Sequence, residues 1–231
     1  MAEDTVSGSS SQDQGQGLVL PEAVILDFGG VLYDIDYDAP VRDFAKLGVE
    51  DFASIYHQHL QSDLFDTLET GGMAPPAFLK ALQDHCRPGT SLEEVSDAWD
   101  SILTGMRPGR LPMLTQLRGM TRLFLLSNTN VLHARRFEAW IERELGSLAA
   151  WRGVFEAVHY SHELGMRKPH PETFLHVCQM HGLTPERTWF IDDSLQHVEG
   201  ARRAGLEATH IQVPGPVDVR DLLIQRGFKL A

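Results

Sequence analysis

Short apolar runs recur along this chain, and several of them end in a polar residue. Four polar residues follow three of the runs: Asp27 follows residues 23–26, Ser127 follows residues 123–126, and Asp192 and Asp193 follow residues 189–191. Apolar runs of this length, bounded by polar or glycine residues, are typical of buried strands in a parallel sheet. Because ligands bind at the carboxyl ends of such strands, we expect these polar side chains to meet at one edge of the sheet.

The second half of the chain alternates between strand-like and helix-like patterns. Further strands are predicted near residue 157 and over residues 209–213, and helices over residues 131–145, 171–180, 195–204 and 217–226. This alternation is typical of right-handed βαβ units. The predicted fold class is therefore α/β, with a doubly wound, Rossmann-like parallel sheet and a small α-helical cap domain.

The cap is predicted from a long helical stretch after the first strand. Residues 39–103 show no convincing strand; amphipathic segments over 52–64, 77–85 and 91–103 are separated by glycine and proline pairs. The predicted division is a disordered tail over residues 1–19, an α/β core over 20–37 and 107–231, and a helical cap over 38–106. The first 16 residues lack the apolar segment of a secretion signal.

Composition excludes several classes of partner. The chain of 231 residues has 32 acidic and 20 basic residues and a net charge of −12, which opposes binding to nucleic acid or to an anionic membrane. This acid excess fits either a well-solvated surface or adaptation to high salt. No apolar stretch approaches the roughly 20 residues needed to cross a bilayer. Cys86 and Cys178 form no CxxC pattern, which favours reduced thiols and a cytoplasmic location.

The segment Asp27-Phe-Gly-Gly carries the most chemistry. A carboxylate at a strand end can attack a phosphoryl group when a divalent cation and fixed donors neutralise the transferring oxygens. Gly29 and Gly30 allow a tight turn, in which a backbone carbonyl can face the metal. Taken alone, this segment is better explained as a strand followed by a glycine turn.

Three companion segments make the phosphoryl site more specific. Ser127 and Asn128 offer a hydroxyl and amides to a phosphate oxygen, although such a pair also serves as an ordinary helix cap. Lys168 precedes a proline that fixes the backbone, which suits a positioned ammonium group. Asp192 and Asp193 repel each other unless a cation compensates their charges, which favours a metal site.

In this order the four segments closely resemble the motifs of the haloacid dehalogenase superfamily, in its phosphatase-like branch with a helical cap between the first two motifs. The resemblance covers residues 24 to about 213. It implies that Asp27 is the nucleophile, that Ser127 and Asn128 bind phosphate, and that Lys168 supports both. It also implies a Mg²⁺ site formed by Asp27, Gly29, Asp192 and Asp193, and a small phosphorylated metabolite as substrate.

One departure from the family pattern concerns proton transfer. Most phosphatases of the family have a second aspartate two residues after the nucleophile, where this chain has Gly29. Loss of a positioned acid–base group costs on the order of 10² to 10⁴ in rate. One explanation is that another group replaces the missing acid. Asp34 and Asp36 are candidates, although they are at least as well explained as solvated loop acids. The other explanation is that the substrate has a leaving group of low pKa. The form Gly-Gly-Val-Leu-x-Asp-Ile-Asp resembles a sub-branch that includes sugar-phosphate phosphatases.

Three functions remain open from the sequence. The first is a Mg²⁺-dependent phosphatase acting through an aspartyl-phosphate; the second is a 2-haloacid dehalogenase using the same nucleophile, against which the paired acids argue. The third is a non-catalytic member that binds a phosphorylated ligand. His57 and His59 do not share a helix face, so no zinc site is expected there. His197 stands where relatives often have asparagine, and Glu69 is a candidate for shaping the pocket.

Overall fold

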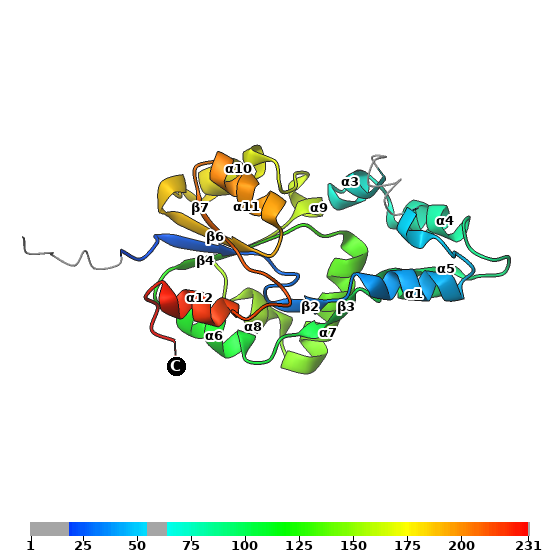
Figure 1. The fold of residues 1–231 in the computed structure, drawn as a ribbon, viewed down its shortest axis with the longest axis horizontal. Helices are drawn as coiled ribbons and strands as arrows, with labels where there is room; N and C mark the ends of the chain where they lie inside the picture. The colour runs from blue at the N-terminus through cyan, green and yellow to red at the C-terminus, as the bar shows by residue number, and fades with distance from the viewer. Residues whose placement is uncertain (1–18, 55–63, 231) are drawn as a thin grey trace, which may run out of the picture.

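The core is a five-stranded parallel sheet in the order β5-β4-β1-β6-β7 (Figure 1). The computed structural model describes residues 19–54 and 64–230. The strands are β1 (Ala23–Leu26), β4 (Arg122–Ser127), β5 (Ala157–Tyr160), β6 (Thr188–Asp192) and β7 (Glu207–His210). The last strand lies earlier than the sequence predicts.

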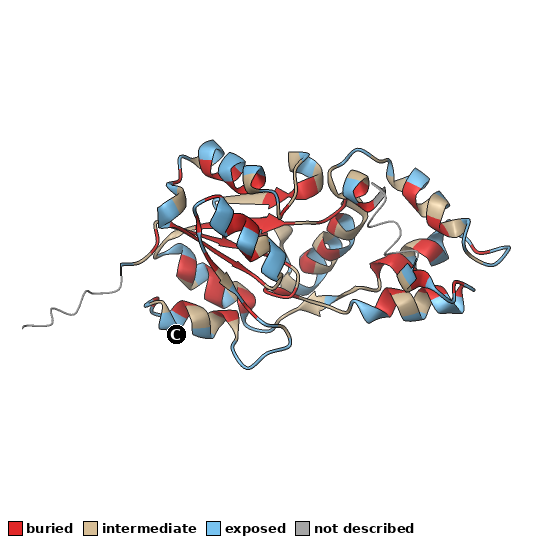
Figure 2. Ribbon diagram, turned by 45° about the horizontal axis from the view of Figure 1, so that its top comes forward, coloured by how far each residue is buried: buried red, intermediate tan, exposed pale blue. Residues whose placement is uncertain are grey.

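Helices cover both faces of this sheet (Figures 1 and 2). Helices α6 (Arg110–Arg118), α7 (Val131–Leu145), α8 (Leu148–Arg152) and α12 (Val219–Gln225) cover one face. Helices α10 (Pro171–His181) and α11 (Leu195–Arg203) cover the other, and α9 (Ser161–Leu164) and the 3₁₀ turn η1 (Pro185–Arg187) join the elements. The doubly wound α/β fold expected from the sequence is confirmed.

The central strand shows why the apolar runs fold in this way. Successive side chains of a strand point to opposite faces, and in β1 Val24 and Leu26 join one apolar cluster while Ala23 and Ile25 join the other. All four residues are completely buried. A strand with both faces covered by helices needs apolar residues at every position, so its sequence is a continuous apolar run.

Four described helices form the cap, at the right of Figure 1. They are α1 (Asp38–Lys46), α3 (Leu64–Glu69), α4 (Pro75–Gln83) and α5 (Leu92–Asp100). Phe44, Phe78 and Trp99 are buried in a third apolar cluster between them. Ser91 and Glu94 form a capping box that starts α5, which satisfies backbone donors at its first turn. We propose that the cap comprises residues 38–106, with the core on either side of this segment in the chain.

A two-stranded antiparallel ribbon, which the sequence did not predict, links the core and the cap. It pairs β2 (Tyr33–Ile35) with β3 (Leu103–Met106). The predicted helix over residues 91–103 is therefore wrong at its end, because α5 stops at Asp100. Strands this short contain too few residues for a two-residue period to be recognised.

The cap also contacts the core directly through α3 and α9. At Gly71, just after α3, an added Cβ would lie 2.4 Å from the backbone oxygen of His162, so only glycine allows this approach. Arg167 of the core forms an ion pair with Asp66 of α3. In the described ranges no helix has the length and apolarity needed to cross a membrane. His57, His59 and nearly all of the predicted tail lie outside these ranges.

Candidate active site

Asp27, Lys168 and Asp192 form a buried charge cluster at the carboxyl end of the sheet. The Lys168 ammonium donates hydrogen bonds to Asp27 Oδ1 at 2.5 Å, to Asp192 Oδ2 at 2.7 Å and to the Leu126 carbonyl at 2.9 Å. Its side chain is completely buried. An ammonium group has three protons, so these three acceptors use them all.

Strand register explains how residues so far apart in the chain meet. Leu26 of β1 pairs with Leu125 of β4 and with Ile191 of β6. The Asp27 amide donates to the Ile191 carbonyl at 3.0 Å, so Asp27 continues the ladder and lies level with Asp192. The edge predicted from the apolar runs therefore brings these two carboxylates together.

Asn128 positions the loop that carries Lys168. Its side-chain amide donates to the Lys168 carbonyl at 2.9 Å and accepts from the Lys168 amide at 3.0 Å. These two bonds fix the backbone from which the lysine side chain extends toward Asp27. One of the two N–H donors of the side-chain amide is used in this way, so the second one and the backbone N–H are both available to a phosphate. Ser127 is buried, lines the pocket and keeps its hydroxyl beside the same turn.

The electrostatics of the cluster favour a cation. Burial raises the pKa of Asp27; the Lys168 ammonium opposes this rise, and Asp192 and Asp193 add to it. Burial also raises the pKa of Asp193 to about 6, with Asp192 acting in the same direction. Burial lowers the pKa of Lys168, but the two carboxylates more than offset this, so its pKa is raised. The site thus gathers three carboxyl groups around one ammonium group.

Three of these side chains fit a divalent metal ion. Asp27, Asp192 and Asp193 each offer a carboxylate oxygen, and these oxygens lie within 4.8 Å of one another. Hard oxygen ligands of this kind suit Mg²⁺. At Gly30 an added Cβ would lie 2.1 Å from Asp193 Oδ2, so the absence of a side chain gives that carboxylate its place. His197 Nδ1 lies 3.0 Å from Asp192 Oδ1 and orients this carboxylate.

A pocket of about 540 Å³ opens above the cluster, between the core and the cap. Asp27, Ser127, Asn128 and Asp193 line its floor. Apolar side chains from the ribbon, the cap and α7 line its walls. Among the polar lining residues that the motifs did not predict as catalytic or ligand residues are Glu69, His133 and Arg167. The sequence predicts for Glu69 only a role in shaping the pocket. His133 and Arg167 carry no local signal, because only the folded arrangement brings them here.

Asp34 and Asp36 do not line this pocket. Asp34 pairs with Arg107 at 2.5 Å, while Asp36 pairs with Arg42 at 2.6 Å and accepts from the Asp38 amide at 2.9 Å. The side chain that reaches the pocket from this segment is Ile35, because successive side chains in β2 point to opposite sides. The candidates proposed to replace an acid at Gly29 therefore lie elsewhere.

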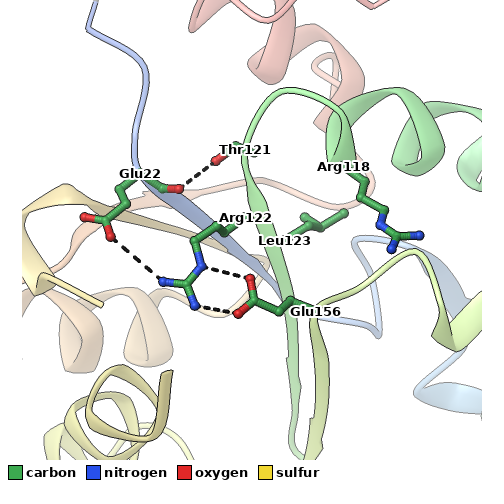
Figure 3. Close-up of a pocket in the computed structure, with 6 residues that line it drawn as sticks. All are labelled: Glu22, Arg118, Thr121, Arg122, Leu123 and Glu156. Atoms are coloured by element: carbon green, nitrogen blue, oxygen red, sulfur yellow. Dashed lines mark hydrogen bonds and ion pairs between the residues drawn. The ribbon is translucent and has the colours of Figure 1, made fainter. Parts of the chain in front are cut away.

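Figure 3 shows a second hollow, of about 460 Å³, at the amino-terminal ends of β1 and β4. Arg122 binds Glu156 there through two hydrogen bonds, the longer of them 2.8 Å, and lies 3.9 Å from Glu22. Arg118 points away from this group (Figure 3). The guanidinium of Arg122 is already neutralised by the two carboxylates of Glu22 and Glu156, and the hollow contains none of the predicted nucleophiles.

Residues 21–205 match the family described as haloacid dehalogenase-like hydrolases, and the chain belongs to this family. It is 30% identical over 186 residues to a D-ribitol-5-phosphate phosphatase of Bacteroides thetaiotaomicron, covering 80% of this chain and 88% of that protein. The family assignment and the enzyme class expected from the sequence, a hydrolase of the phosphatase branch, are confirmed.

Solved structures agree with this assignment. A haloacid dehalogenase family enzyme from Bacteroides thetaiotaomicron, in complex with magnesium and inorganic phosphate, superposes with a TM-score of 0.74 at 27% identity, covering 85% of this chain and 96% of that one. L-2-haloacid dehalogenase from Xanthobacter autotrophicus superposes with a TM-score of 0.57 at 19% identity, covering 91% of this chain and 85% of that one. The second likeness concerns the fold alone.

Proposed function

We propose that this chain is a Mg²⁺-dependent phosphatase that hydrolyses a small phosphorylated metabolite through an aspartyl-phosphate on Asp27. The observation that carries the proposal is the position of Asp27: its carboxylate is bonded to a buried ammonium, has two further carboxylates within metal-binding reach, and lies at the floor of a pocket. A carboxylate held in this way can attack phosphorus directly.

The residues of the site have distinct roles in this proposal. Asp27 attacks the phosphoryl group, Lys168 holds the nucleophile in place, and Ser127 with the backbone of Asn128 binds phosphate oxygens. Asp27, Asp192, Asp193 and the backbone carbonyl of Gly29 would hold Mg²⁺. When bound, that ion supplies positive charge to the phosphoryl oxygens.

The lining of the pocket supports a small metabolite as substrate. Apolar walls, including Ile35, Trp99 and Phe137, face the polar groups of Glu69, His133 and Arg167. Such a mixture suits a ligand with both carbon and hydroxyl surfaces. The ribitol-phosphate specificity named for the relative points the same way, so we propose a sugar phosphate or polyol phosphate. Cys86 and Cys178 are both free thiols, which supports the proposed cytoplasmic location.

The paired acids weigh against the dehalogenase alternative. Dehalogenases of this kind need no cation, whereas Asp192 and Asp193 converge with Asp27 as a cation-binding set. Release of chloride from 2-chloropropionate in excess EDTA would favour the dehalogenase instead.

The test is a phosphate-release screen over phosphosugars, polyol phosphates, nucleotides and aryl phosphates, with Mg²⁺ and with EDTA. The variant Asp27→Asn is measured beside the unmodified enzyme. We expect release that depends on Mg²⁺ and is lost in Asp27→Asn. Turnover that persists in this variant would contradict the proposal, and binding of phosphate without any turnover would favour a non-catalytic member.

A further inference from the structure

The leaving oxygen of a phosphate ester needs a proton donor that Gly29 does not provide. In a phosphoryl transfer the attacking and leaving oxygens lie roughly in line on opposite sides of phosphorus. Asp27 attacks from the end of β1, so the leaving oxygen faces the pocket and the cap above it. At Gly29 an added Cβ would lie 3.3 Å from Ile35 Cδ1, so an apolar side chain occupies the space beside this residue.

The described pocket contains four carboxyl groups: Asp27, Asp38, Glu69 and Asp193. Asp27 is the proposed nucleophile and Asp193 a proposed metal ligand, so neither is available. Asp38 is exposed at the start of α1. Glu69 is the only one of the four that is both partly buried and contributed by the cap.

His133 is not an alternative donor. Its Nδ1 lies 3.2 Å from the Asn130 side-chain nitrogen, which donates to it, and its Nε2 lies 3.2 Å from the Trp99 carbonyl, which accepts its proton. Both ring nitrogens are therefore already used. Burial lowers the pKa of His133 to about 4, so the ring is neutral at physiological pH.

Glu69 lines the pocket and has one buried carboxylate oxygen without a hydrogen-bond partner among the described residues. Its Oε2 is enclosed and, within the described part of the chain, has no hydrogen-bond partner; Arg167 Nη2 lies 3.2 Å away without hydrogen-bond geometry. Buried carboxylate oxygens nearly always have a hydrogen-bond partner, so one without a partner in a residue that lines a pocket indicates a ligand contact. The ion pair of Arg167 with Asp66 and the close contact of Gly71 with His162 hold this end of α3 against the core.

We propose that Glu69 is the general acid and base of the reaction, an inference that rests on the proposed function. In the first step Asp27 forms a bond to phosphorus and the ester bond breaks. The leaving oxygen takes the electron pair of that bond and the proton of the Glu69 carboxyl group. In the second step a water molecule attacks phosphorus and gives a proton to the Glu69 carboxylate, and the Asp27–phosphorus bond breaks to release inorganic phosphate.

The surroundings of Glu69 suit both halves of this role. Burial raises its pKa to about 7, and the Lys168 ammonium opposes that rise. Arg167 lies 3.2 Å from Glu69 Oε2 and also pairs with Asp66, and its positive charge favours the carboxylate form that the second step needs. His162 belongs to α9, which packs against α3. Near neutral pH the carboxyl and carboxylate forms are then both well populated, which is the condition for an efficient acid and base.

The test compares two classes of ester in the Mg²⁺-loaded enzyme. p-Nitrophenyl phosphate leaves as a stable anion and needs no proton, whereas ribitol 5-phosphate and glycerol 3-phosphate, two primary alkyl phosphates, do. Because the second step is common to all of these esters, the readout is release of the alcohol in a single turnover. We expect Glu69→Gln to slow this first step by about 10² to 10³ for the alkyl esters and by less than about tenfold for the aryl ester. In the unmodified enzyme this single-turnover rate for the alkyl esters falls above pH 7, and the variant lacks this pH dependence.

The matched control is Asp66→Asn, which removes a partner of Arg167 from the same helix but keeps the acid. We expect it to leave the ratio of the aryl to the alkyl single-turnover rate unchanged. Equal slowing of the first step for both classes of ester in Glu69→Gln, or no slowing, overturns the role of Glu69. Failure of the unmodified enzyme to release phosphate from either class of ester would instead overturn the proposed function, and the role of Glu69 with it.

Discussion

Replacing Lys168 with methionine tests whether the site is a buried ion cluster. Methionine has a similar length and packs beside Phe190, whose ring centroid lies 5.3 Å from the ammonium nitrogen. The substitution removes hydrogen bonds to Asp27, Asp192 and the Leu126 carbonyl. Two buried carboxylates then lose their cation while the apolar contacts remain.

The size of the effect follows from the burial of these groups. The side chains of Lys168 and Asp192 are completely buried, and that of Asp27 is 10% exposed. Removing one partner of a buried ion pair costs about 3–5 kcal/mol, because the other partner stays buried and unpaired. We therefore expect Lys168→Met to lower the free energy of unfolding by about 3–5 kcal/mol in EDTA.

Urea denaturation followed by tryptophan fluorescence measures this loss. The control is Lys80→Met, since Lys80 is exposed and pairs with Asp84 on the cap surface; we expect a loss of about 0–1 kcal/mol. Millimolar Mg²⁺ should recover part of the Lys168→Met loss, because a ligand that binds only the folded state stabilises it. A loss below about 1 kcal/mol in EDTA would refute the inference that these carboxylates depend on Lys168.

Two further predictions concern other acids. Burial raises the pKa of Asp100 to about 6; the folded state therefore holds a proton between pH 4 and 6 that the unfolded chain has lost, and stability falls as the pH rises through this window. Asp100→Asn should accordingly have a free energy of unfolding higher than that of the unmodified chain by about 1–2 kcal/mol at pH 7.5 and by much less at pH 4. The gain stays below the full value of the pKa shift because water still reaches part of the carboxyl group. Thermal or urea unfolding at both pH values checks this, and a pH-independent difference would speak against it. The double variant Asp34→Asn, Asp36→Asn should keep kcat within about threefold of the unmodified enzyme, because neither side chain lines the pocket and exposed ion pairs contribute little to stability. A hundredfold loss in the rate of phosphate release would show that one of them reaches the substrate.

The core of the fold was predictable because its signal is local. Residues 23–26, 123–126 and 189–191 are apolar throughout since both faces of each strand are covered, and they lie within β1, β4 and β6. Helix α7 spans the predicted residues 131–145. The meeting of Asp27 with Asp192 then follows from parallel strand register alone.

The ribbon and the cap contacts were not predictable in the same way. Asp34 is close to Asp27 in sequence, but its direction depends on β2 being a strand, and a three-residue strand leaves no recognisable pattern. Had β2 been predicted, the alternation of its side chains would have separated Ile35 from Asp34. Glu69 and Arg167 come from segments about 100 residues apart, so only tertiary packing places them together over the nucleophile.

The most direct test of the account is to look for the phosphoryl group on Asp27. The enzyme is mixed with p-nitrophenyl phosphate and Mg²⁺, quenched in acid within one turnover and digested for peptide mass spectrometry. We expect a single acid-stable, hydroxylamine-labile phosphoryl group on the peptide that contains Asp27, and none in Asp27→Asn. Rapid phosphate release with Asp27 unmodified at every quench time, or with the phosphoryl group on another residue, would contradict it.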